Sequence, residues 1–296
     1  KPCSRRFGAQ CILNYFPRHC GGFSPVTMLR QYHSRAARLA VMRRYRFVLV
    51  AAEAMRQEYT RHGFTPRQVQ VLQYPIESAT LHSGSSETVP ESPCANQVRR
   101  DFGSEAVRLL FAGRMVPLKG GEVLLQSLPD ISRILHRPVK LIMVGDGPAK
   151  VRWAGKGQMV CAQHPSISVE FTGWQQSAAV QRLAETCDLL VLPSLWPEPF
   201  GMIGPEAGYA QLPAVAFAVG GIPEWLHDGV NGVLAPADPP SATGLASAVA
   251  KCLASSSFHA QLRRGAKREA MKFSLDRHVN KLLAIFAQAF NEGSRV

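Results

Sequence analysis

Residues 107–121 of the chain read VRLLFAGRMVPLKGG. The first six residues are almost continuously apolar, which is typical of a strand buried on both faces. The turn that follows carries two cations, Arg114 and Lys119, and opens into a helical pattern. Backbone N–H groups at the start of a helix favour an anion and the cations would reinforce them, so we expect a phosphate or diphosphate here. A surface loop with two ordinary cations is the alternative.

The order of strand, loop and helix recurs after this stretch. Apolar runs predict strands at 107–112, 139–144, 167–172, 189–193 and 214–217. Helical patterns are found at about 120–135, 148–160, 176–186, 201–210, 241–255, 257–272 and 275–291. Apolar strands that alternate with helices predict an α/β fold with a parallel sheet covered on both faces. Ligands of such sheets bind beyond the carboxyl ends of the strands, so the chemistry is expected in the loops there.

Two carboxylates follow the fourth of these strands. Residues 193–207 read PSLWPEPFGMIGPEA, which places Glu198 in the loop and Glu206 inside the next helix. The amides from Phe200 to Ile203 lie at the predicted helix start. A carboxylate accepts hydrogen bonds from two neighbouring hydroxyls, so this pair around an amide-rich turn suits a nucleotide-linked sugar. The alternative is a pair of capped or ion-paired structural carboxylates.

Glycine-rich loops follow two other strands. Residues 145–148 read GDGP, which suits a tight strand-to-helix crossing and is half of a dinucleotide fingerprint at best. Residues 220–225 read GGIPEW, where a glycine pair permits close backbone approach and Glu224 lies near a helix start. For this second loop the sequence leaves a structural role and a donor-lining role both open.

Composition and charge limit the remaining possibilities. The chain has 296 residues, 46% of them hydrophobic, which excludes a disordered or collagen-like protein and suggests about two domains. Residues 1–70 contain 13 Lys and Arg but only two acids, Glu53 and Glu58. This asymmetry points to an anionic partner, such as membrane headgroups or a phosphorylated substrate, or else to a solvated basic face. No nucleic-acid module accompanies the charge, so we expect no nucleic-acid partner.

The first part of the chain predicts a smaller unit. A helix over 26–45, a strand over 47–51, a helix to about His62 and a strand over 69–72 make one strand–helix–strand unit. Residues 76–98 are rich in Ser and Pro, as linkers are. The seven cysteines show no disulfide framework; Cys3, Cys11 and Cys20 could bind zinc with His19, but they lack a Cys-x-x-Cys pair and are expected to be free or buried thiols.

Taken together, the motifs resemble those of retaining GT-B glycosyltransferases, in particular glycosyltransferase family 4. The matching stretches are FAGR to LKG over 111–120, VGDGP over 144–148, FTG over 171–173, CDLLVLPS over 187–194, the Glu198–Glu206 pair, GGIPE over 220–224 and DGVNG over 228–232. The resemblance is strongest over about 107–240.

The resemblance implies roles for individual residues. Arg114 and Lys119 would hold the donor diphosphate as it leaves, Glu198 would position the transferred sugar, and Glu206 would bind the ribose. The donor-binding set that it implies consists of Gly113, Gly173, Trp174, Phe200, Gly201, Met202, Ile203 and Glu206. No metal and no cofactor beyond a UDP- or GDP-linked sugar is expected, because fixed cations and dipoles stabilise the charge.

The resemblance also implies a domain plan. We expect a partial acceptor-side Rossmann-like domain over 1–75, a linker over 76–106, a complete nucleotide-sugar-binding domain over 107–272, and a helix over 273–296 that packs back toward the first domain. The glycine-rich loop and histidine that such enzymes carry early in the acceptor domain have no counterpart, so an N-terminally truncated chain is expected.

The leading hypothesis is therefore a retaining, metal-independent glycosyltransferase of lipid-linked or surface polysaccharide synthesis. Its expected location is cytoplasmic, at the inner face of an anionic membrane that residues 1–70 would contact. One alternative is a nucleotide-sugar-binding module without turnover, because the acceptor domain is incomplete. A second is isomerase chemistry on the same fold, against which the placing of Glu198 beside the Phe-Gly-Met turn argues.

Overall fold

A computed structural model of the chain divides into two compact units, Lys1–Gln73 with Val279–Val296, and Tyr74–His278. We describe each unit by itself. The described residues are 3, 5–20, 23–76 and 106–293. Most of the predicted linker, together with Cys94, lies outside them.

The larger unit is built on a six-stranded sheet in which every strand pair is parallel. Its strands are β3 (Val107–Ala112), β4 (Val139–Val144), β5 (Ile167–Gly173), β6 (Leu189–Leu192), β7 (Ala214–Phe217) and β8 (Gly232–Ala235). The strand order is β5-β4-β3-β6-β7-β8. The chain runs outward from β3 to β5 and then restarts beside β3 at β6, so the order reverses between these two strands. That switch point is where open α/β sheets bind ligands.

The sixth strand, β8, is missing from the sequence-based prediction. It has only four residues and follows the turn-forming run DGVNG, so neither its length nor its flanks distinguish it from a loop. It forms because residues 214–217 of β7 offer an open edge, with which residues 232–235 pair in register. The five predicted strands are confirmed, with ends that differ by one residue at most.

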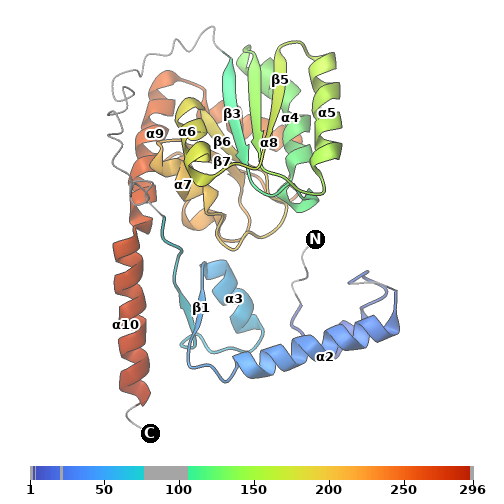
Figure 1. The fold of residues 1–296 in the computed structure, drawn as a ribbon, viewed down its shortest axis with the longest axis vertical. Helices are drawn as coiled ribbons and strands as arrows, with labels where there is room; N and C mark the ends of the chain where they lie inside the picture. Colours follow the sequence, from blue (N-terminus) through green and yellow to red (C-terminus); the bar gives the residue numbers. More distant parts are fainter. Residues whose placement is uncertain (1–2, 4, 21–22, 77–105, 294–296) are drawn as a thin grey trace. The chain divides into compact units, whose positions relative to one another are not determined.

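Helices cover both faces of this sheet, as the apolar strands predict; Figure 1 shows α4 and α5 on one side and α6 and α7 on the other. Their bounds are α4 (Gly121–Leu135), α5 (Lys150–Gln163), α6 (Ser177–Thr186), α7 (Ile203–Tyr209), α8 (Ala242–Cys252) and α9 (Ser256–Ala270). The final helix, α10 (Leu275–Gly293), begins in this unit, and its residues from Val279 onward belong to the smaller unit. Leu124 and Leu128 of α4, Trp153 of α5 and Leu245 of α8 join the strand residues in one fully buried cluster. This core holds the carboxyl ends of the strands in place.

The smaller unit contains a two-stranded parallel sheet of β1 (Val48–Val50) and β2 (Val69–Val71), with α3 (Glu53–Arg61) between them. Its other helices are α1 (Gln10–Leu13) and α2 (Pro25–Met42). Val48, Val50, Phe64 and Val69 form its buried cluster. The Arg46 guanidinium donates to the Ala289 carbonyl in the final part of α10. The predicted strand–helix–strand unit is thus confirmed.

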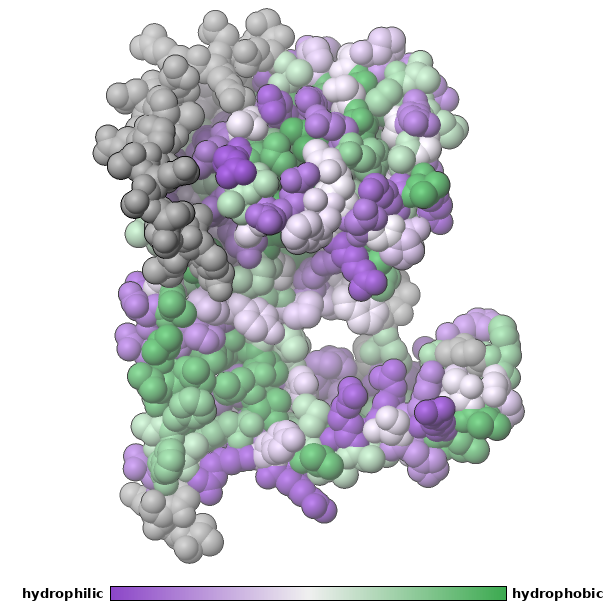
Figure 2. All heavy atoms as spheres, viewed as in Figure 1, coloured by the Kyte–Doolittle hydropathy of each residue, from purple (hydrophilic) through white to green (hydrophobic). Residues whose placement is uncertain are grey.

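Helix α2 carries three of the 13 cations of residues 1–70. Ser24 caps it by accepting a hydrogen bond from the Thr27 N–H at 3.4 Å, and Pro25 opens it. The helix contains three arginines, no acidic residue and no buried residue. Figure 2 shows hydrophilic and hydrophobic side chains interspersed over the region that Figure 1 labels α2. Among the described residues, no helix combines the length and apolarity that crossing a bilayer requires.

Candidate functional site

The loop between β3 and α4 presents both predicted cations. Its backbone is fixed from two directions, because the Met115 N–H donates to the Asp146 carbonyl at 2.8 Å and the Leu195 N–H donates to the Leu118 carbonyl at 2.8 Å. Met115 itself is fully buried. The loop thus lies against the loops after β4 and β6, at the switch point of the sheet.

Gly120 closes this loop and starts α4. Its φ of 69° lies in the left-handed region, and a Cβ there would lie 1.8 Å from the Pro193 carbonyl oxygen. A residue with a side chain would be strained and would also clash with the neighbouring backbone. The glycine therefore lets the loop that carries Lys119 approach the end of β6 closely.

Lys119 and Glu198 meet across this contact. The Lys119 Nζ lies 2.7 Å from the Glu198 Oε1, which also accepts a hydrogen bond from the Ser194 hydroxyl at 2.5 Å. The Glu198 side chain is only 9% exposed, whereas that of Lys119 is 36% exposed. A buried carboxylate needs such partners, and the two of them fix its direction.

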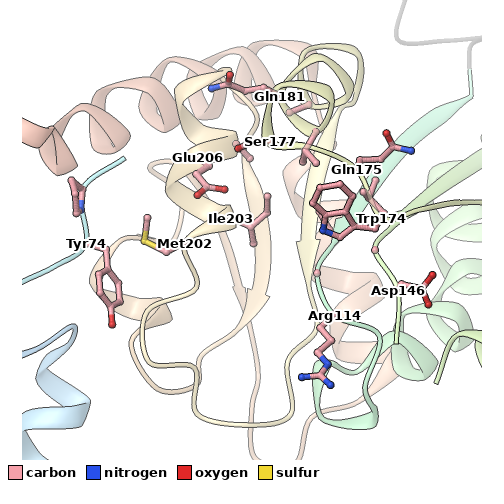
Figure 3. A pocket seen from close by; sticks show the side chains of 18 residues that line it. Tyr74, Arg114, Asp146, Trp174, Gln175, Ser177, Gln181, Met202, Ile203 and Glu206 are labelled. Carbon is pink, nitrogen blue, oxygen red and sulfur yellow. The ribbon is translucent and has the colours of Figure 1, made fainter. Parts of the chain in front are cut away.

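A cavity of about 960 Å³ opens beside these loops. Figure 3 shows Glu206 projecting from α7, with Ile203 in the same wall and Trp174 in the loop after β5. Arg114 and Asp146 approach from the loops after β3 and β4 (Figure 3). A space of this size accommodates a ligand as large as a nucleotide.

A second cavity of about 360 Å³ adjoins the first. Lys119, Glu198, Phe200 and Gly201 line only this one. The two cavities share the wall residues Tyr74, Ala112, Gly113, Met202 and Ile203. The shared wall makes them neighbouring compartments of one site.

The structure therefore gathers most of the predicted site residues, but it divides the cations. Arg114, Trp174 and Glu206 line the larger cavity, while Lys119 lines the smaller one. Gly173 lines neither. It ends β5 with a φ of 73°, and its carbonyl accepts a hydrogen bond from the Gly145 N–H at 2.8 Å.

Asp146 is a carboxylate of the larger cavity that the sequence prediction does not include. Its side chain accepts hydrogen bonds from the Lys150 ammonium and the Gly147 N–H, both at 2.7 Å. These two donors hold the pKa of Asp146 below its ordinary value, in that order of importance. The carboxylate is thus occupied in turning the chain into α5, which leaves the rim of the cavity without an unpaired acid at this point.

Two further site residues are missing from the sequence prediction. Tyr74 lines both cavities, and its ring lies 6.4 Å from the ring of Phe200 in an edge-on arrangement. Ser194 supports Glu198 from a position that is 2% exposed. Tyr74 lies just before the predicted linker and carries no motif, whereas Ser194 lies inside the quoted 193–207 stretch, four residues before the carboxylate that it supports.

The candidate zinc ligands stay apart. Within the described part of the chain, no three His, Cys, Asp or Glu side chains gather closely enough to hold a metal ion. Cys3, Cys11 and Cys20 are free thiols of the smaller unit.

Comparison with known proteins identifies the family. Residues 106–255 match the family model described as Glycosyl transferases group 1, which is half of the chain. The chain belongs to the group 1 glycosyl transferases. Among curated relatives, it is 28% identical over 237 residues to the D-inositol 3-phosphate glycosyltransferase of Salinispora tropica, covering 78% of this chain and 48% of that protein. The chain spans about half the length of the curated relatives that it matches.

Solved structures support the fold of this group 1 member. Anabaena Alr3699/HepE in complex with UDP and glucose matches with a TM-score of 0.67 at 22% identity, over 92% of this chain and 69% of that one. Sucrose-phosphate synthase from Thermosynechococcus elongatus matches with a TM-score of 0.69 at 19% identity, over 97% and 67%. These likenesses confirm the predicted α/β fold of GT-B type.

Proposed function

We propose that the chain binds a nucleotide sugar in the paired cavities and transfers the sugar to an acceptor. The observation that carries the proposal is that each of the two adjoining cavities, at the switch point of the sheet, is lined by a cation and a carboxylate. Arg114 and Glu206 line the larger cavity, while Lys119 and Glu198 line the adjoining smaller one. The larger space suits the nucleotide and the smaller one the sugar, with the diphosphate at the shared wall.

The chemistry follows from the charges. Breaking the bond between sugar and phosphate leaves negative charge on the diphosphate, and the two cations of the β3–α4 loop stabilise that charge. Glu198 accepts hydrogen bonds from sugar hydroxyls, and Glu206 does the same for the ribose. The backbone of Phe200, Gly201 and Met202 contributes N–H donors to the sugar. Because the fixed cations supply the positive charge, we propose that transfer needs no divalent metal.

We further propose that transfer retains the configuration at the anomeric carbon, as the resemblance to family 4 implies. Proton NMR of the newly formed linkage reads that configuration directly. A retained configuration, with turnover unchanged by EDTA, is expected. An inverted product would contradict the retaining mechanism, and loss of turnover in EDTA would contradict the metal-independent one.

The donor is proposed to be UDP-linked or GDP-linked. UDP is favoured, because the Anabaena structure that matches this chain holds UDP and glucose. Calorimetry of the full chain with UDP-glucose, UDP-N-acetylglucosamine and GDP-mannose tests this. We expect binding of at least one of them with a 1:1 ratio. Failure of all three to bind, and of their nucleoside diphosphates, would overturn the proposal.

A nucleotide-sugar-binding module without turnover is the second candidate. It is favoured by one observation: all the described residues that line the two cavities belong to the unit Tyr74–His278. The larger unit alone is therefore proposed to bind the donor. Release of UDP or GDP in the presence of a membrane extract as the acceptor source distinguishes the two functions, because a binding module would take up the donor without releasing the nucleotide.

The acceptor is proposed to be lipid-linked, at the inner face of an anionic membrane, in polysaccharide or glycoconjugate synthesis. Helix α2 supports this with its three arginines, Arg30, Arg35 and Arg38, and the absence of acids. Val26 and Leu29 on the same helix are 75% and 46% exposed. Basic residues among exposed apolar ones suit a surface of anionic headgroups.

Vesicle flotation tests the membrane contact. Each arginine near an anionic surface contributes about 1 kcal/mol, so replacing the three by Ala should weaken binding to phosphatidylglycerol vesicles about 100-fold. The matched control replaces three exposed arginines of the other unit, namely Arg133, Arg264 and Arg277. Equal binding by both triple variants would contradict the contact. Full activity on a soluble phosphorylated acceptor without vesicles would point to such an acceptor instead.

A further inference from the structure

The turn that separates the two cavities is held from behind by the loop after β7. Phe200 and Gly201 line the smaller cavity, and Met202 lines both. The Trp225 indole Nε1–H, from a residue that lines neither cavity, donates to the Phe200 carbonyl of this turn at 2.7 Å. The Gly221 N–H donates to the Glu198 carbonyl, also at 2.7 Å. The turn therefore rests on a second loop that takes no part in either cavity wall.

Trp225 is firmly anchored in its own place. It is 2% exposed, and the Asn231 side-chain amide donates to its carbonyl at 2.7 Å. The Asn231 Oδ1 accepts a hydrogen bond from the His227 N–H at 2.7 Å, so both ends of that side-chain amide are occupied. Trp225 lines neither of the two cavities described above. It can affect a bound donor only through the turn that it supports.

Two glycines make room for this support. A Cβ on Gly204 would lie 2.0 Å from the Trp225 ring, so the indole fills the space against the start of α7. A Cβ on Gly220 would lie 2.3 Å from the Glu198 carbonyl oxygen, and Gly220 has a φ of 58°. The glycine pair at 220–221 thus packs under the loop that carries Glu198. Of the two roles that the sequence left open for this motif, these contacts favour the structural one.

The hydrogen bond from Trp225 fixes a direction as well as a position. In a trans peptide the carbonyl and the following N–H point in opposite directions. Holding the Phe200 carbonyl toward the indole therefore aims the Gly201 N–H away from it. Gly201 has a φ of 84° and lines the smaller cavity, so nothing in its own side chain restricts the rotation of this peptide.

We propose that Trp225 is a positioning residue for the donor sugar. Its indole N–H orients the Phe200–Gly201 peptide so that the turn can bind the sugar. Loss of this hydrogen bond would weaken binding of the sugar and leave binding of the nucleotide unchanged. This inference rests on the proposed function, because it assigns the smaller cavity to the sugar. The restraint of the turn by the Trp225 indole N–H does not depend on a bound donor, so it can be tested without one.

The test compares two Trp→Phe substitutions in the same unit. Trp225→Phe keeps an aromatic ring against Gly204 and removes the N–H that bonds Phe200. Trp153→Phe is the matched control, since Trp153 is fully buried and its Nε1 has no hydrogen-bond partner in the described part of the chain. Both variants lose a ring N–H, but only one loses a hydrogen bond.

Calorimetry of the full chain then measures the nucleotide sugar and its nucleoside diphosphate separately, with UDP-glucose and UDP as the first pair. In Trp225→Phe we expect the nucleotide sugar to bind about tenfold more weakly, with less than about a twofold change for the diphosphate. Trp153→Phe should change neither. Equal weakening of the binding of both ligands by Trp225→Phe would overturn the proposal, because a general loss of structure would give that result. Unchanged binding of both ligands would also overturn it, because the indole N–H would then have no effect on the sugar.

Hydrogen–deuterium exchange tests the restraint without a donor. Amides within residues 198–203 should exchange faster in Trp225→Phe than in the wild type and in Trp153→Phe. If Trp225→Phe does not fold, the isosteric analogue 3-benzothienylalanine at position 225 removes the N–H and keeps the ring shape. Unchanged exchange in the folded variant would refute the restraint. Failure of the wild type to bind any nucleotide would instead refute the proposed function, and the exchange result would still decide the role of Trp225.

Discussion

The Lys119 Nζ lies 2.7 Å from the Glu198 Oε1, although the two residues come from different loops, 79 positions apart in the chain. The pair joins the group proposed to hold the leaving diphosphate with the group proposed to hold the sugar. Both residues line the smaller cavity. A charge on either residue is therefore felt by the other.

Lys119→Ala should lower turnover by about 10²- to 10³-fold, because a fixed donor to the developing charge is lost. The substitution also leaves the nearly buried Glu198 carboxylate with the Ser194 hydroxyl as its one remaining side-chain hydrogen-bond donor among the described residues. Initial rates at saturating donor measure the effect. Lys140→Ala is the control, since Lys140 pairs with the exposed Glu170 on neighbouring strands. Wild-type rates in Lys119→Ala would exclude its proposed role.

Arg114→Ala should reduce turnover by a similar factor of about 10². Arg114→Lys should recover only part of it, because an ammonium cannot bind two phosphate oxygens as a planar guanidinium does. Nucleotide release assays on the two variants provide the comparison. The exposed Arg133, which pairs with Asp130 on α4, gives a control of equal charge change. An Arg114→Ala enzyme as fast as the Arg133→Ala enzyme would be incompatible with the assignment.

Glu206→Ala should weaken binding of the donor and of the free nucleoside diphosphate alike, because a ribose contact is common to both. The expected factor is about 10- to 150-fold, from about 1.5–3 kcal/mol for hydrogen bonds to a charged group. Calorimetry with UDP and UDP-glucose measures it. The control Glu170→Ala removes an exposed carboxylate from β5. Weakening confined to the sugar-bearing ligand would move Glu206 to the sugar instead.

His259 should make the larger unit less stable in mild acid. Burial lowers the pKa of His259 from its ordinary 6.5, although the hydrogen bond with the Asp188 carbonyl opposes the shift. The unfolded chain therefore takes up the proton at higher pH than the folded one. The contribution of neutral His259 to the free energy of unfolding is complete above about pH 6.5. It is lost as the pH falls toward the lowered pKa of His259 in the folded protein.

Urea unfolding at about pH 7.5 and about pH 5.5 measures this loss in the wild type and in His259→Gln. The substitution should remove part of the pH dependence, whereas His33→Gln, at an exposed histidine of α2, should not. An identical loss of stability in His259→Gln and in the wild type would show that other groups cause it.

Much of the larger unit could be predicted from its sequence, because the residues of each predicted strand themselves form an apolar run that indicates the strand. The apolar runs at 107–112 and 139–144 form β3 and β4 with the predicted bounds. β8 was not predictable in this way, since its pairing depends on the edge that β7 offers.

The site shows the same division. The sequence places Glu198 and Glu206 on one loop and helix by their spacing. It does not show that Tyr74 would lie beside Phe200, because that contact joins segments far apart in the chain. Ser194 is only four residues from Glu198, but the direction of its hydroxyl depends on the conformation of the irregular loop that joins them. The sequence likewise does not show the role of the glycine pair at 220–221, because that role depends on the close approach of Gly220 to the Glu198 backbone.

The hydrogen bond from the Leu195 N–H to the Leu118 carbonyl, 2.8 Å long, has a consequence for protein engineering. It ties the cation-bearing loop to the carboxylate-bearing loop, and Gly120 reinforces the tie by its approach to Pro193. Grafting one of these loops from a homologue of different sugar preference would therefore leave it mismatched with the other. A successful exchange of donor preference would transplant residues 113–120 and 193–203 together, as one cassette.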